Sequence, residues 1–160
     1  MKKFELTAEF VTNIFGKKLF RIKALVAFGD VEKGELGGFI EKEDNLSHSG
    51  NAWVSGNAWV YGDARVYGNA WVSGNAQVSG DADYAVVTGF GRYFRATTFF
   101  RCKDKILRVQ CGCFYGDLAQ FRKIVKKTHG DSKYAKEYLA IADLMEFHFS
   151  DEEEKQEAAK

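Results

Sequence analysis

Apolar and polar positions repeat every six residues in the middle of the chain. From Gly50 to Ser79, five hexads run in the order Gly, Asn or Asp, Ala, a variable residue, Val, and Ser or Tyr. Alanine and valine lie two positions apart, so an extended strand turns both to the same side and buries them. Glycine and the short amides favour corners because they accept a positive φ. Each hexad therefore predicts one short strand plus one corner, and the fixed period predicts a solenoid.

These hexads resemble the hexapeptide repeat of left-handed parallel β-helices, in which three hexads form one triangular coil. The resemblance implies that residues eighteen positions apart stack on one face, with Trp53 under Trp71 and Val54 under Val72. Asn45-Leu46-Ser47 is interpreted as a degenerate hexad in which Leu46 takes the place of Ala52. The valines expected inside the coil are Val54, Val60, Val66, Val72 and Val78.

The segments on either side of the repeat predict further β-structure and two helices. Alternating apolar positions before the hexads indicate strands that close one end of the coil. Behind the hexads, β-like stretches lead to helices that begin at Asp117 and near Ser132. The fold class is thus mainly β. Its predicted parts are an N-terminal β cap (1–43), a short left-handed β-helix (44–83), a C-terminal β and two-helix module (84–149) and an acidic disordered tail (150–160).

A wider resemblance covers nearly all residues up to Phe149. The stretches that carry it are 19–25, 28–31, 34–41, 45–47, 97–101, 111–114, 128–131 and 135–139. Together with the hexads, they are similar to small β-helix proteins abundant in bacteriophages and prophages of Firmicutes, including a C-terminal module that recurs in those proteins. The family is usually labelled transferase-like from its fold alone. The resemblance therefore implies an architecture and a phage setting rather than an activity.

Charge along the chain is uneven although the net charge is only +1. Residues 92–136 carry a net charge of +9, whereas the segments on either side are acidic. Arginine forks bind phosphates and aromatic rings stack on bases, so this block fits a nucleic acid, a nucleotide or an acidic protein surface. The alternative is an ordinary strand with Phe inside and Arg outside. The candidate binding residues are Arg92, Tyr93, Phe94, Arg95, Arg101, Arg122, Lys123, Lys126 and Lys127.

The variable hexad position points outward and often holds a tryptophan. Trp53, Trp59 and Trp71 occupy it together with Arg65, and outward tryptophans on a flat face form an apolar patch. Such patches usually mark an interface, so these four residues predict contacts within a homo-oligomer. The alternative is that the C-terminal helices cover the tryptophans.

Candidate catalytic and metal-binding residues are few. His48 is the only histidine near the coils, and no loop carrying a catalytic histidine interrupts the hexads, so we interpret it as a surface residue. Cys102, Cys111 and Cys113 are odd in number and lack the paired C-x₂-C spacing of zinc sites. We interpret them as small buried residues and predict neither a metal nor a cofactor.

These observations favour a non-catalytic phage-type binding protein that acts stoichiometrically on a host macromolecular machine. The partner would be a host protein or ribonucleoprotein, as for an inhibitor of an anti-phage defence such as CRISPR. One alternative is sequestration of a signalling nucleotide between subunits, and another is a hexapeptide-repeat acyltransferase. No apolar run is long enough for a membrane span and no signal peptide is evident, which predicts a cytoplasmic location, that of the host cell for a phage protein.

Overall fold

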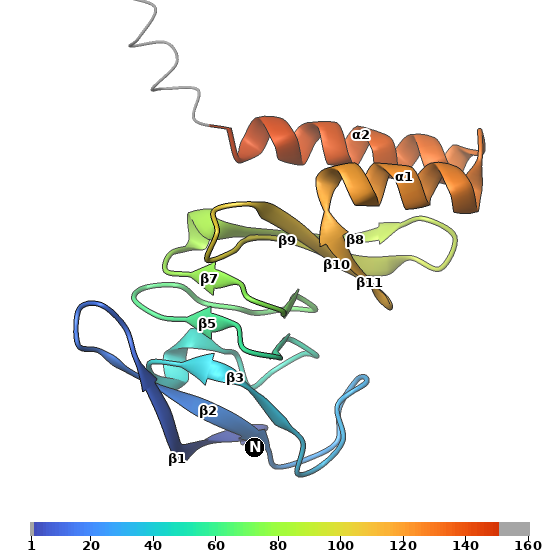
Figure 1. Cartoon of the computed structure of the whole chain (residues 1–160). Helices are drawn as coiled ribbons and strands as arrows, with labels where there is room; N and C mark the ends of the chain where they lie inside the picture. The colour runs from blue at the N-terminus through green and yellow to red at the C-terminus, as the bar shows by residue number, and fades with distance from the viewer. Residues whose placement is uncertain (1, 151–160) are drawn as a thin grey trace, which may run out of the picture.

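The computed structural model describes residues 2–150, and it places a β-solenoid between an N-terminal hairpin and a C-terminal sheet covered by two helices (Figure 1). The predicted mainly β fold with two C-terminal helices is confirmed. The prediction of a disordered tail falls, from residue 151 onward, outside the described residues. The strands are β1 (Phe4–Thr12), β2 (Lys18–Ala24), β3 (Leu36–Ile40), β4 (Trp53–Val54), β5 (Trp59–Val60), β6 (Trp71–Val72), β7 (Gln77–Val78), β8 (Tyr84–Phe90), β9 (Arg95–Arg101), β10 (Leu107–Cys111) and β11 (Phe114–Asp117), and the helices are α1 (Leu118–His129) and α2 (Lys133–His148).

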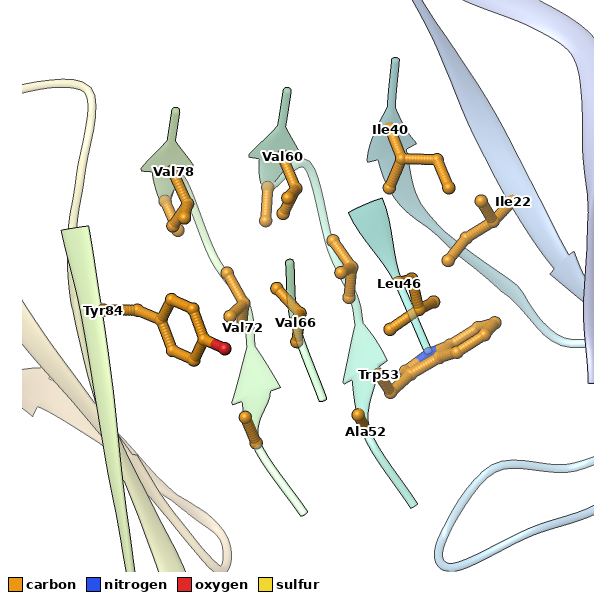
Figure 2. Packing of buried hydrophobic residues seen from close by; sticks show 14 of the residues in the cluster. Ile22, Ile40, Leu46, Ala52, Trp53, Val60, Val66, Val72, Val78 and Tyr84 are labelled. Atoms are coloured by element: carbon orange, nitrogen blue, oxygen red, sulfur yellow. The ribbon is translucent and has the colours of Figure 1, made fainter. Parts of the chain in front are cut away.

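The hexads stack as the repeat predicts. β4 pairs in parallel with β6 and β5 with β7, so that Trp53 lies opposite Trp71 and Trp59 opposite Gln77, eighteen residues apart. The inward position of the five repeat valines is confirmed, because each of them is fully buried. Figure 2 labels Val60, Val66, Val72 and Val78 among them. The five corner glycines have φ between +61° and +71°, which a residue with a Cβ rarely adopts. The left hand of the coil stays a prediction.

The parallel ladder begins before the sequence repeat becomes visible. Ile40 of β3 pairs with Val60, and Leu46 forms a parallel bridge to Val66, each pair being twenty residues apart. Leu46 therefore stands at the valine position of its coil, and the expectation that it replaces Ala52 was wrong. The cause is a corner with two additional residues, since Leu46 precedes Val54 by eight positions rather than six.

A lysine closes the N-terminal end of the coil. The carbonyls of Gly50 and Ala52 have no preceding coil to pair with, and the Lys3 ammonium donates to both, at 3.4 and 2.7 Å from Nζ. The same ammonium lies over the Phe28 ring, 4.5 Å from its centroid, in a cation–π contact. Lys3 is thus buried while satisfying two strand-edge acceptors that would otherwise lack partners.

Burial of Lys3 makes the stability of the fold depend on pH. Loss of hydration lowers the pKa of Lys3 from its usual 10.5 to about 8. Between these two values the unfolded chain binds a proton that the folded chain has released, so the free energy of unfolding should rise with pH, by at most about 1.4 kcal/mol per pH unit. Urea denaturation at pH 7.5, 8.5 and 9.5 measures this rise. Lys3→Met should remove it, and parallel pH curves for the two proteins would contradict the assignment.

The C-terminal sheet closes the other end of the coil. Its strand order is β11-β10-β9-β8, all antiparallel. Tyr84 of β8 follows Val78 by six residues and extends the line of inward side chains (Figure 2). Phe100 of β9 packs into the same core. The neighbouring Phe99 belongs to a second core, formed with α1 and α2 on the opposite face of the sheet. β9 is therefore buried on both faces.

The two helices begin and end where their capping residues predict. Asp117 accepts a hydrogen bond from the backbone N–H of Gln120 and caps the start of α1, and Gly130 caps its C-terminal end after His129. The Ser132 side chain caps α2 in the same way. The predicted inner face of α2 is confirmed, because Tyr138, Ile141, Ala142 and Met145 are buried. Within residues 2–150, neither helix is long and apolar enough to cross a membrane.

Candidate functional site

The turn between β8 and β9, residues 91–94, packs on α2 and has an aromatic tip. We call residues 92–95 the hairpin tip. Gly91 is buried with φ +77°, and a Cβ there would collide with the Tyr138 hydroxyl of α2. That hydroxyl in turn donates to the Phe90 carbonyl at 3.4 Å. Seated on α2 in this way, the turn leaves Tyr93 and Phe94 exposed by about two thirds, at 68% and 67%.

Two arginines give the hairpin tip an uncompensated positive charge. The guanidinium groups of Arg92 and Arg95 lie 6.0 and 5.2 Å from the centroid of the Tyr93 ring. Both arginines are exposed, and across residues 2–150 neither forms an ion pair. Phe94 has φ +56°, which is uncommon for a residue with a side chain and indicates a turn held by its surroundings. The hairpin tip therefore presents two cations and two aromatic rings side by side.

A cavity of about 240 Å³ opens beneath the hairpin tip, between the sheet and α1; we call it the hairpin pocket. Its floor is apolar and is formed by Phe114, Phe121, Ile124 and Val125. Its rim carries Arg92, Tyr93, Arg95 and His129. The floor residues were not predicted as site residues from the sequence. Their pattern indicated only a core-facing side of α1, and the sequence contains no signal that places this side beneath the turn.

A wider groove of about 880 Å³ lies on the other side of Arg95; we call it the solenoid groove. Trp71 and Asn69 of the coil line it together with Asp30 of the loop before β3. The indole N–H of Trp71 donates to the Ser55 hydroxyl at 2.9 Å, which fixes the ring against the coil. Because Arg95 borders both hollows, it is the central cation of the site.

The other predicted basic residues fall into two groups. Lys123, Lys126 and Lys127 are exposed on α1 and form no ion pair within the described part of the chain. Ile124 and Thr128, which follow Lys123 and Lys127, line the hairpin pocket, so α1 adds positive charge beside the hairpin tip.

Arg101 and Arg122 are not part of this site. Arg101 donates to the Phe149 carbonyl at 3.2 Å and lies 3.4 Å from an Asp83 carboxylate oxygen, at the far end of β9 from the hairpin tip. Arg122 pairs with two carboxylates of α2, from Asp143 at 3.0 Å and Glu146 at 2.8 Å. Both charges are paired within the molecule and lie outside the hairpin tip, so their role in binding stays a prediction that the hairpin tip does not support.

The tryptophans do not form one exposed patch. Trp53 is fully buried beneath the loop before β3, where it meets the Phe28 ring edge-on at 5.3 Å between centroids. Trp59 lies on a different ladder, between Phe39 and Gln77, and Trp71 lines the solenoid groove.

Neither explanation of the tryptophans, an exposed interface patch or a cover by the C-terminal helices, fits the structure. Arg65 is exposed beside Val66, on the third side of the coil. The C-terminal helices cover none of the three tryptophans, because they pack on the sheet instead. The patch that motivated homo-oligomerisation is therefore absent, and the oligomeric state itself stays a prediction.

His48 is a structural residue. Its Nδ1 accepts the backbone N–H of Lys3 at 3.0 Å, and its Nε2 lies 2.8 Å from a carboxylate oxygen of Glu43. The ring stacks on Phe4 with 4.2 Å between centroids. The hydrogen bond from His48 lowers the pKa of Glu43. Because both ring nitrogens have partners, neither is available to take a proton from a substrate.

The three cysteines differ in their surroundings. Cys102 is buried at the end of the solenoid, where burial raises the pKa of its thiol. Cys111 is half-buried and its sulfur accepts the Thr97 hydroxyl at 3.2 Å, whereas Cys113 is exposed in the turn before β11. The expectation that all three are buried is thus correct for Cys102 alone. In the described range, no three His, Cys, Asp or Glu side chains gather closely enough to hold a metal ion.

Comparison with known proteins finds one similarity, which lies in the repeat. The chain is similar to a family described as the YdcK beta solenoid repeat, which matches residues 58–74 and 64–80. The two matches are displaced by six residues, which is one hexad, and they lie within the stacked coils. This similarity supports a β-solenoid repeat and covers neither end module. No curated protein matches the chain.

Proposed function

We propose that the protein binds an anionic partner through the hairpin tip, stoichiometrically and without turnover. One observation carries the proposal. Arg92 and Arg95 lack acidic partners within the described chain and stand beside two exposed rings on a turn that α2 holds in place. Arginine forks bind carboxylates and phosphates strongly, and rigid aromatic anchors lose little entropy on binding.

The chemistry around the hairpin tip supports binding over catalysis. No carboxylate lines the hairpin pocket among the described residues, so its rim holds no acid–base pair of carboxylates. Cys113 and His129 both border the pocket, but in the described structure no hydrogen bond joins them as a nucleophile and its base. The acyltransferase alternative also loses support, because it needs a histidine as general base and both ring nitrogens of His48 already have hydrogen-bond partners.

The proposed biological setting of this partner rests on the family resemblance and not on the geometry of the site. A phage-type accessory protein directed at a host protein or ribonucleoprotein, such as an inhibitor of CRISPR or another anti-phage defence, remains the proposed setting, in the host cytoplasm. Sequestration of a signalling nucleotide remains the second candidate. For this candidate the solenoid groove, a hollow of about 880 Å³, offers a stacking ring in Trp71 and a phosphate fork in Arg95. The carboxylates of Asp30 and Glu35 on the same lining oppose a phosphate, so the groove supports a nucleotide less well than the hairpin tip supports an acidic partner.

Removing both hairpin arginines should weaken anion binding about tenfold or more. The probes are a fluorescent twelve-residue glutamate peptide and a twelve-nucleotide thymidine DNA strand, with anisotropy measured from 20 to 200 mM salt. We expect the wild-type protein to bind at least one probe, more weakly as salt rises. Arg92→Gln/Arg95→Gln should lose two exposed ion pairs with the probe, which contribute up to about 1 kcal/mol each, and about 1.4 kcal/mol corresponds to a tenfold change in affinity.

The matched control is Lys23→Gln/Lys42→Gln, which removes two exposed positive charges of the N-terminal part, neither of which lines the hairpin pocket or the solenoid groove. This variant should bind within about twofold of wild type, since distant surface charges contribute little at moderate salt. Equal weakening by both double variants would mean that net charge alone drives binding. Chemical change of either probe during incubation would contradict the absence of turnover.

A further inference from the structure

The floor of the hairpin pocket is apolar and already ordered. The Phe121 ring meets Tyr138 edge-on at 5.7 Å and Phe114 at a tilted 5.8 Å, which holds the three rings in place. The Tyr138 hydroxyl is directed to the Phe90 carbonyl. A nucleobase buried here would leave the hydrogen-bonding groups of its edge without partners at the floor, which costs free energy. The floor therefore fits an apolar group better than a base.

The size of the hairpin pocket also limits what enters it. Pockets that enclose drug-sized ligands typically measure about 300–1,000 Å³, and this one measures about 240 Å³. That volume fits one large apolar side chain. Binding energy at protein interfaces is concentrated in such anchors, which are buried in a pocket and surrounded by a polar rim.

The rim determines the charge of the segment that carries the anchor. Arg92 and Arg95 lie at the mouth with His129, and the exposed Lys123 and Lys127 of α1 flank it. No acidic side chain of the described chain lines the pocket. A complementary partner has carboxylates on either side of its apolar residue, placed to meet the two guanidinium forks.

We propose that the hairpin pocket takes a single apolar side chain, of the size of phenylalanine, from an acidic segment of a partner protein, with neighbouring carboxylates bound by Arg92 and Arg95. This inference rests on the proposed function and deepens it, because it names an acidic protein segment rather than a nucleic acid as the partner. The apolar floor supplies affinity, and the two arginines fix the direction in which the segment lies.

A pair of peptides tests the anchor. One is a twelve-residue glutamate peptide with a central phenylalanine, and the other has alanine at that position; the thymidine strand is the third probe. Full burial of a phenylalanine side chain contributes about 1.5–3 kcal/mol, so the phenylalanine peptide should bind at least about tenfold more tightly than the alanine peptide. The thymidine strand should bind no more tightly than the alanine peptide.

A variant that fills the pocket locates the effect. Ile124 lies at the partly exposed edge of the floor, so the larger ring of Ile124→Trp should fill the pocket. This variant should abolish the preference for the phenylalanine peptide and keep the weaker, salt-sensitive binding of both peptides. Ile106→Trp is the matched control, because Ile106 is similarly exposed and lies in a loop that does not line the pocket. This control should retain the full preference.

The outcomes separate the two proposals. Equal affinity for both peptides, with weakening by Arg92→Gln/Arg95→Gln, overturns the anchor and keeps anion binding at the hairpin tip. A preference that survives Ile124→Trp places the side chain elsewhere and also overturns it. Tighter binding of the thymidine strand than of the phenylalanine peptide identifies nucleic acid as the partner. Binding of every probe without any loss in the double arginine variant, or binding of none at millimolar protein, overturns both proposals.

Discussion

Val66→Asp should prevent the chain from folding into a soluble protein. Val66 is fully buried in the middle of the coil, where its neighbours above and below are also apolar. An aspartate there would bury a carboxylate with no cationic partner in a dry interior, at a cost of several kcal/mol, which is comparable to the whole stability of a domain of this size. The soluble fraction after expression and the circular dichroism of any recovered protein measure the effect.

Asn57→Asp provides the matched control for Val66→Asp. It introduces the same carboxylate at an exposed corner, and the next hexad already holds Asp63 at the equivalent position. The control should express and melt like the wild type. Recovery of Val66→Asp with unchanged melting would show that the inward assignment of the valines is incorrect.

Gly38→Ala should destabilise the fold strongly although it adds only one methyl group. Gly38 of β3 is buried against the coil, and a Cβ at this position would come within 2.7 Å of the Ala58 carbonyl oxygen and 2.8 Å of a Val54 methyl carbon. The carbonyl belongs to the backbone that receives the ladder bond from Phe39, so it has no freedom to retreat. Overpacking of this kind costs about 1–3 kcal/mol or more and should lower the urea midpoint accordingly.

Gly80→Ala controls for the general effect of adding a methyl group. Gly80 has extended backbone with φ −157°, and nothing lies within 4 Å of the position of its Cβ. Its stability should stay equal to that of the wild type or rise slightly, because alanine restricts the unfolded chain. Equal urea midpoints for Gly38→Ala and the wild type would mean that β3 sits more loosely on the coil than the structure indicates.

The regular part of the fold could be predicted because its cause is local. A hexad specifies its own corner and its own inward side chains, and stacking repeats the same environment at each level. The environment of Trp53 could not be predicted in this way. The repeat assigns it an outward direction, whereas the loop that carries Phe28, more than twenty residues earlier, and Gly37 of β3 cover it. The six-residue repeat likewise does not reveal the two additional corner residues before Val54, so it could not predict the position of Leu46 in its coil.

The candidate site could likewise be predicted only where its residues are neighbours in the sequence. Arg92, Tyr93 and Arg95 are neighbours in sequence, so composition alone was enough to identify them. Arg122 looked similar, but its carboxylate partners lie twenty-one and twenty-four positions away on another helix, and pairing across that distance depends on how α1 and α2 pack. The net charge of a sequence segment therefore overestimates the unpaired charge that the folded protein offers to a partner.

The burial of β9 on both faces ties together the stabilities of the two cores. Phe99 and Phe100 are adjacent in the chain and belong to different cores, and the same strand begins at Arg95 of the hairpin tip. Neither core can open by losing β9 without exposing a phenylalanine of the other, which makes the strand a mechanical link between them. A partner that binds only the folded hairpin tip at Arg95 therefore raises the free energy of unfolding of both cores. The solenoid is stabilised in this way although the partner does not contact it.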